Sequence, residues 1–118
     1  MNKTLKVGNR ELTLESNAGT ALFYKRIFRK DIIKIISEMS EDDSIVDMSD
    51  LSMELCFVMS KQGEGGIGIS SMLSLTYDDY VEWVCSFSSD AFMNTNVITQ
   101  VMEIWQGNNE TTSEVKNA

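Results

Sequence analysis

The segment from Asp50 to Gln62, DLSMELCFVMSKQ, decides the fold of this 118-residue chain. Its middle, from Leu55 to Met59, is apolar at five consecutive positions. A helix that is apolar on every face has to be covered on most of its sides. We therefore expect a central helix over about residues 49–62, with the rest of the chain packed around it.

Two alternating segments near the start of the chain predict a β-hairpin. Leu5 and Val7 lie in the first segment, Leu12 and Leu14 lie in the second, and Gly8-Asn9 separates them. Both linker residues tolerate a positive φ angle, which is typical of a two-residue hairpin turn. We expect strands at about 3–7 and 10–14, and because an isolated hairpin is marginal in water, it should lie on the helices.

Two helical segments are expected between the hairpin and the central helix. Ser16 or Asn17 is a candidate N-cap for the first, and Asp31 is one for the second. The residues expected on the buried faces of these helices are Leu22, Phe23, Ile27, Phe28, Ile32, Ile33, Ile35 and Ile36.

Two more helices are expected after the central one. Thr76 and Asp79 have the spacing of a capping box, and Ser88 or Ser89 would cap the last helix. Their expected buried residues are Tyr80, Trp83, Val84, Phe87, Met93, Val97, Ile98, Val101, Met102 and Trp105. Gly107 is a candidate stop, so the prediction is one α+β, mostly helical domain over residues 1–106, with a hairpin on four to five helices and a disordered polar tail over 107–118.

The formal net charge of −8 is distributed unevenly along the chain. Residues 1–36 carry a balance of +5, and the remainder carries −13. Such asymmetry either holds the fold together or gives it a polarised surface. Part of the positive charge, at Lys25, Arg26, Arg29 and Lys30, is expected on the outer side of the first helix. A nucleic-acid ligand is not favoured, because the chain as a whole is acidic.

The residues usually responsible for catalysis are scarce. The chain has no histidine, the commonest general base and metal ligand. Cys56 and Cys85 lie in apolar surroundings and are expected to be buried, reduced thiols. The acidic segment 40–50 lacks the EF-hand spacing, and GEGGIG at 63–68 lacks the Lys-Ser/Thr of a phosphate-binding loop. We therefore expect no enzyme activity, no cofactor and no metal.

The sequence contains no apolar run that approaches the ~20 residues of a membrane span. Its first fifteen residues lack the apolar core of a signal peptide. The expected location is therefore the cytoplasm.

Several segments, taken in order, resemble the tail assembly chaperones of siphophages and prophages of Gram-positive bacteria. They are NAGTALFYKRIFRKDII at 17–33, FVMSKQ at 57–62, DDYVEWV at 78–84, and Ile104-Trp105 followed by Asn108, Thr111 or Thr112, Ser113 and Lys116. The likeness covers nearly the whole chain, and the last segment is the most specific. Family members often have a glycine near position 29, where this chain has Arg29, which implies a softer break between the first two helices.

The resemblance implies a non-catalytic chaperone in the bacterial host cytoplasm, absent from the mature virion. It would bind the tape-measure protein, keep it soluble and help to recruit tail-tube protein, the latter through a form extended by a ribosomal frameshift. The residues that we expect to bind the partner are Lys25, Arg26, Arg29, Lys30, Met53, Phe57, Trp83 and Trp105. Asn108, Thr111, Thr112, Ser113 and Lys116 would lie in a tether before the extension.

The eight methionines agree with a chaperone, because unbranched thioether side chains re-pack against varied partners. Core filling is the competing explanation for these methionines. An alternative function also stays open: a small phage-encoded acidic regulator or inhibitor could bind a host protein, with the −13 stretch imitating nucleic acid.

Overall fold

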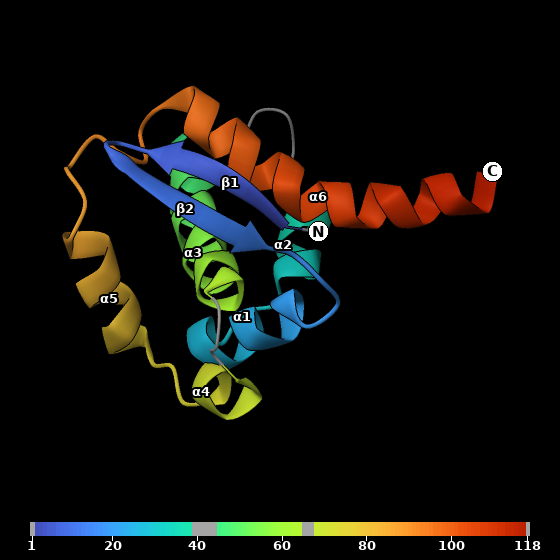
Figure 1. Ribbon diagram of the computed structural model, residues 1–118, viewed down its shortest axis with the longest axis horizontal. Helices are drawn as coiled ribbons and strands as arrows, with labels where there is room; N and C mark the ends of the chain where they lie inside the picture. Colours follow the sequence, from blue (N-terminus) through green and yellow to red (C-terminus); the bar gives the residue numbers. More distant parts are fainter. Residues whose placement is uncertain (1, 39–44, 65–67, 118) are drawn as a thin grey trace.

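The computed structural model describes residues 2–38, 45–64 and 68–117, with the backbone alone for 45–47 and 108–117. The described part is an N-terminal two-stranded hairpin followed by six helices (Figure 1). The predicted α+β, mostly helical fold is therefore confirmed, with one helix more than expected.

The hairpin has the predicted position and the predicted buried face. Strands β1 (Asn2–Val7) and β2 (Arg10–Glu15) pair antiparallel, with Leu5 opposite Leu12. The turn places Gly8 at φ +62°, in the left-handed region that glycine adopts without strain. The four apolar side chains named above, two from each strand, are all buried.

The central helix α3 (Ile45–Gly63) carries the core, as its sequence predicts. It starts earlier than residue 49, and its residues 55–59 are all completely inaccessible to solvent. Strand β2 packs on α3, and the last helix α6 packs on both α3 and β1. Figure 1 shows the hairpin crossing α3 with α6 beside it.

Helix α1 (Thr20–Phe28) buries Ile27 and Phe28 as predicted, but the rest of its buried face differs from the prediction. Its buried residues include Tyr24, whereas Leu22 is 59% exposed. The expected cap is also displaced: Asn17 accepts a hydrogen bond from the backbone N–H of Gly19 (2.8 Å), before the helix begins. The rotation follows from packing against α3, where the Tyr24 hydroxyl finds a buried partner.

The break between α1 and α2 (Ile32–Glu38) is sharp, so the expectation of a softer break is wrong. Arg29 ends α1 in the left-handed conformation at φ +59°, as a glycine would do at this position. Asp31 then caps α2 as predicted, because its Oδ1 accepts from the backbone N–H groups of Ile33 and Lys34. Only Ile32 of the four isoleucines of α2 is buried, and Ile33 is 62% exposed.

A short helix that the sequence did not predict, α4 (Ile69–Leu73), lies before α5 (Tyr77–Cys85). The predicted capping box of α5 is confirmed: Thr76 accepts from the backbone of Asp79, whose carboxylate accepts from the backbone of Thr76. The inward-facing residues of α5 are those expected from its spacing, with Tyr80 and Trp83 buried.

Helix α6 (Thr95–Asn117) starts later and ends later than predicted. Met93 lies before it and is 66% exposed. The side chain of Asn94, rather than that of Ser88 or Ser89, accepts from the backbone N–H of Asn96 (2.8 Å). The helix continues through Gly107, which therefore does not stop it. The side chains expected in the tether, from Asn108 onward, lie outside the described residues.

The end of α3 approaches β2 too closely for any side chain at Gly63. A Cβ atom there would lie 2.7 Å from the carbonyl carbon of Thr13 and would overlap its carbonyl oxygen. We expect Gly63→Ala to lower the free energy of unfolding by about 1–3 kcal/mol or more, because backbone has to move. Gly68→Ala is the control, since nothing lies within 4 Å of that Cβ position, and it should cost less than about 1 kcal/mol. Equal urea midpoints for both variants would contradict the close approach.

Candidate functional site

A groove of about 790 Å³ lies between α1 and the segment from the end of α4 to the start of α5. Its walls combine apolar and cationic side chains. The residues that line it, which we call the basic groove, are Leu22, Lys25, Arg26, Ile27, Phe28, Arg29, and residues 73–77.

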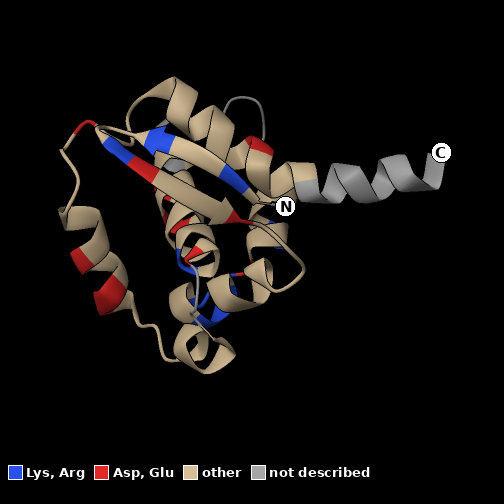
Figure 2. Cartoon of the chain, in the orientation of Figure 1, with Lys and Arg blue, Asp and Glu red and all other residues tan. Residues whose placement is uncertain are grey.

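The basic groove contains several large apolar side chains that are exposed to solvent close to one another. Leu22 is 59% exposed, Leu73 is 39% exposed and Tyr77 is 55% exposed. Lys25 and Arg26 stand on the last turn of α1 beside them, and all three cations of the groove are exposed. Figure 2 shows the basic segments of α1 next to α4. An apolar surface rimmed by charge is typical of a protein-binding site.

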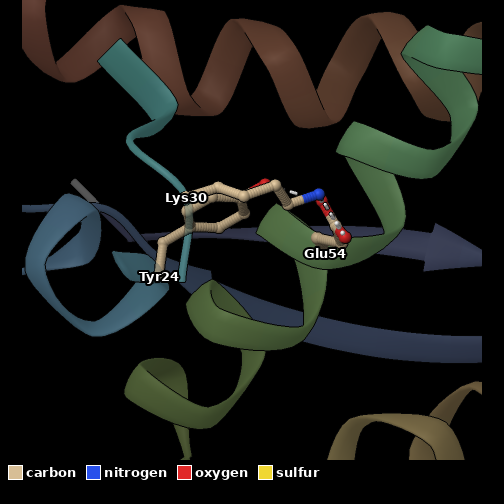
Figure 3. A network of polar contacts seen from close by, with 3 residues as sticks. All are labelled: Tyr24, Lys30 and Glu54. Carbon is tan, nitrogen blue, oxygen red and sulfur yellow. Dashed lines mark hydrogen bonds and ion pairs between the residues drawn. The ribbon is translucent and has the colours of Figure 1, made fainter. Parts of the chain in front are cut away.

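Lys30, predicted to face the partner with the other three cations, is instead held in a polar network. Its Nζ atom lies 3.1 Å from Oε2 of Glu54 on α3, and the Tyr24 hydroxyl donates to Oε1 of the same carboxylate at 2.6 Å (Figure 3). Burial, reinforced by the hydrogen bond to Glu54, raises the pKa of Tyr24 well above its usual range. The network ties α1 and the residues that follow it to α3, and Lys30, whose side chain is 48% exposed, does not line the basic groove.

A second groove, of about 480 Å³, lies between α3 and the end of α5. Part of α3, within residues 49–53, forms one side, and the last residues of α5 and those that follow it form the other. Met53 and Met93 line it together with the rings of Phe87 and Phe92, and Asp50 is also in its wall. We call it the methionine groove. Met93 is 66% exposed and is therefore not core filler, whereas Met53 is partly buried and packs against the core. Met59 and Met102 are buried and do fill the core.

The floor of the methionine groove is held in place by polar contacts to other elements. The Ser49 hydroxyl donates to the carbonyl oxygen of Phe92 at 2.8 Å. Arg10 of the hairpin donates to the Ser86 hydroxyl at 2.6 Å, and its guanidinium lies 4.1 Å from the centre of the Phe87 ring. The turn after α5 is thereby tied to both α3 and β2.

Three aromatic residues expected to contact a partner belong to the core. Phe57 is fully buried, Trp83 is 9% exposed and Trp105 is 7% exposed. Phe57 and Trp83 stack edge to face with ring centroids 5.4 Å apart. These residues are large apolar side chains on the inward faces of α3, α5 and α6, so the fold itself covers them, and they are unsuitable as surface contacts.

The two cysteines differ, and the expectation that both are buried is wrong for one of them. Cys56 is fully buried on α3, and burial raises the pKa of its thiol to about 12. Cys85 is exposed at the end of α5, where it lines the methionine groove. Only Cys85 is therefore positioned to react with a reagent in solution.

No metal-binding cluster is present in the part of the chain that the structure describes. Among the same residues, none of the helices has the length and apolar character needed to cross a membrane. Comparisons with protein-family models, with curated proteins and with solved structures find none that matches this chain.

The sequence predicts the cations of the basic groove, but it predicts burial for Leu22, Ile27 and Phe28, which form part of the apolar lining. Leu73 lies in a helix that was not predicted, and Tyr77 was not singled out. One signal was available in α1, which has more apolar residues than one helical face can bury: Leu22, Phe23, Tyr24, Ile27 and Phe28. Such an excess indicates that at least one of them faces solvent or a partner.

Proposed function

We propose that this chain is a non-catalytic phage tail assembly chaperone that holds a helical segment of the tape-measure protein in its basic groove. The observation that carries the proposal is the gathering of exposed apolar and cationic side chains between α1 and α4. Leucine and tyrosine side chains there can cover the apolar stripe of a partner helix, while the cations meet acidic residues at the edges of that stripe.

The physical character of the partner follows from this chemistry. A long coiled-coil chain has an apolar stripe that aggregates when it is unpaired, and charged residues commonly flank such a stripe. Covering the stripe one segment at a time keeps the chain soluble without a reaction step. The chaperone's own net charge of −8 opposes its self-association during this task.

The wider role follows the resemblance described above. The protein acts in the cytoplasm of the bacterial host and is released before the virion is complete. Tail-tube protein is recruited by a frameshift-extended form, in which residues 107–118 lead from the buried part of α6 to the extension. Binding of the tape-measure protein needs only the folded part.

Co-expression with the tape-measure protein encoded downstream tests the proposal. The wild-type chain is expected to bring that protein into the soluble fraction and to co-purify with it. Reversing two groove charges, in Lys25→Glu with Arg26→Glu, should lower the soluble tape-measure fraction severalfold, since attraction becomes repulsion. The matched control is Lys3→Glu with Lys34→Glu, which changes the net charge equally at exposed sites outside the groove and should leave solubility unchanged.

Two results would contradict the proposal. If the tape-measure protein stays insoluble with the wild-type chain, this form is not its chaperone. If both double variants lose activity equally, the overall charge matters and the basic groove does not. Displacement of DNA from a host protein by the wild-type chain would instead support the acidic inhibitor.

A further inference from the structure

Exposed apolar side chains form a path that links the two grooves. Of the seven large apolar residues that are exposed in the described part of the chain, five lie along it: Leu22, Leu73, Tyr77, Val81 and Met93. The first three line the basic groove, and Met93 lines the methionine groove. Val81 lies on α5 between the two grooves and is 40% exposed.

Helix α5 makes the path continuous. Tyr77 at its start belongs to the basic groove, and Val84 and Cys85 at its end belong to the methionine groove. At 100° per residue, Tyr77, Val81 and Cys85 fall on one side of the helix, which is a different side from that of the buried Trp83. With a rise of 1.5 Å per residue, the two grooves are separated by only about 12 Å along α5.

The exposed charges along this path are cationic at the α1 end and acidic along α5, although Arg10 also reaches the far end, where its guanidinium lies over the Phe87 ring. Lys25, Arg26 and Arg29 lie at the α1 end. Asp78 and Glu82 follow the path along α5 and are exposed, and Asp50 lines the methionine groove at the far end. Figure 2 shows the same division, with acidic segments on α5 and basic ones on α1.

From this arrangement we infer that both grooves and the outer face of α5 form one docking surface for a single amphipathic helix of a partner protein. That helix carries acidic residues at the end that lies over α1 and basic residues at the end that lies over the methionine groove. Its apolar stripe covers Leu22, Tyr77, Val81 and Met93. The inference rests on the proposed function only in taking the tape-measure protein as the source of the helix.

Met53 and Met93 are suited to binding the partner helix at the methionine-groove end of the docking surface. A thioether side chain on three rotatable bonds adapts to apolar residues of different shape. Met53 and Met93 can therefore accept successive segments of a long chain whose residues differ, while the charges set which end of each segment lies over α1.

Two synthetic peptides of 21 residues, about 30 Å long as helices, provide the probe. Both have leucine at the positions of an amphipathic stripe and the same numbers of Glu and Lys. One has Glu in its first half and Lys in its second, and the other has them mixed. By fluorescence anisotropy at low salt, the segregated peptide is expected to bind the wild-type chain about tenfold more tightly than the mixed one. Salt at about 0.5 M should reduce the difference.

The peptides differ in their own helicity, so variants of the protein supply the control. In Lys25→Glu with Arg26→Glu, the preference for the segregated peptide should disappear. The same two peptides are used with the wild-type chain and the variant, so their difference in helicity affects both affinity ratios equally. Val81→Asp should weaken the segregated peptide about tenfold, because it puts a charge in the middle of the path. Ile33→Asp is the matched change at an exposed apolar residue outside the path, and it should change binding by less than about twofold.

Alkylation of Cys85 gives a measurement on the unmodified protein. Cys85 is exposed in the methionine groove, whereas Cys56 is fully buried, so iodoacetamide should modify the folded chain at Cys85 alone. The segregated peptide is expected to slow this reaction severalfold, because it has to cover both grooves.

Unslowed alkylation at saturating peptide, or equal affinity for the segregated and mixed peptides, would overturn the inference. These results are separable from those of the co-expression experiment. A chain that solubilises the tape-measure protein but shows no peptide preference is a chaperone with a different docking surface. A chain that binds the segregated peptide along both grooves but leaves the tape-measure protein insoluble has the surface and a different partner.

Discussion

Replacing Phe57 with alanine is expected to lower the free energy of unfolding by about 3–5 kcal/mol, the usual cost of removing a buried aromatic side chain. Phe57 lies in the middle of α3 and is fully buried. Its ring centroid lies 5.5 Å from that of Tyr80 and 5.4 Å from that of Trp83. The substitution leaves a cavity between α3 and α5, which the rigid neighbouring rings cannot fill by relaxing.

The effect should be large because Phe57 connects two groups of rings. Phe28 on α1 contacts Tyr80, with centroids 4.9 Å apart, and Trp83 contacts Phe87 at 4.8 Å on the other side. Edge-to-face pairs contribute about 0.5–1.5 kcal/mol each beyond the burial of their area. Removing the central ring therefore weakens the attachment of α5 at both ends.

Urea unfolding followed by circular dichroism measures this cost. The control is Tyr77→Ala, because Tyr77 belongs to the same aromatic series but is 55% exposed, and it should cost less than about 1.5 kcal/mol. Equal losses for the two variants would mean that burial does not determine the contribution of these rings. A change in the denaturant slope for Phe57→Ala would indicate that unfolding is no longer two-state or that the compactness of the native or denatured state has changed.

Replacing Trp105 with alanine is expected to cost about 3–5 kcal/mol for the same reason, at the opposite side of the core. Trp105 is 7% exposed and belongs to the buried face of α6, together with Val101 and Met102. Helix α6 packs on α3 and on β1, so a cavity there loosens both contacts.

Trp105→Phe and Gln106→Ala provide the comparison. The phenylalanine keeps most of the apolar volume and should cost no more than about half as much. Gln106 is exposed and its truncation should change stability by less than about 0.5 kcal/mol. The protein has two tryptophans, so Trp83 remains as a fluorescent reporter in both variants of Trp105. A loss below about 1 kcal/mol for Trp105→Ala would mean that this side chain is not buried in solution.

The core could be predicted from the sequence because its signals are local. Five consecutive apolar residues in α3, a Gly-Asn turn between alternating segments and a Thr-to-Asp capping box each specify one structure with few alternatives. The hairpin and the start of α5 are accordingly where the sequence predicts them, and α3 covers the predicted residues but begins four residues earlier.

The errors concern which apolar residues are left uncovered. Leu22, Ile33 and Met93 belong to patterns that predict burial, and all three are exposed. An amphipathic pattern identifies the apolar side of a helix. How much of that side is buried depends on the elements that pack against it, and these are distant in the sequence. In α1 the decisive neighbour is Glu54, 30 positions away, whose carboxylate accepts from Tyr24 and so fixes the rotation of the helix.

The candidate site was predictable in its charge and not in its shape. Lys25, Arg26 and Arg29 stood out as a basic cluster, but the groove beside them requires the approach of residues 73–77. The methionine groove likewise joins Met53 to Met93 across 40 positions. No local pattern connects residues so far apart, and a single sequence offers no covariation from which to infer the contact.

The packing of β1 against α6 has a consequence for how the chain folds during synthesis. Strand β1 leaves the ribosome long before α6, against which it packs, so its buried face has no complete cover until residues near Trp105 have emerged (Figure 1). The hairpin and α3 can associate earlier, but they expose apolar surface until α6 has been synthesised and has packed on them. Nascent chains stalled before Val97 should therefore be digested readily by proteases, and those that include Trp105 beyond the exit tunnel should resist.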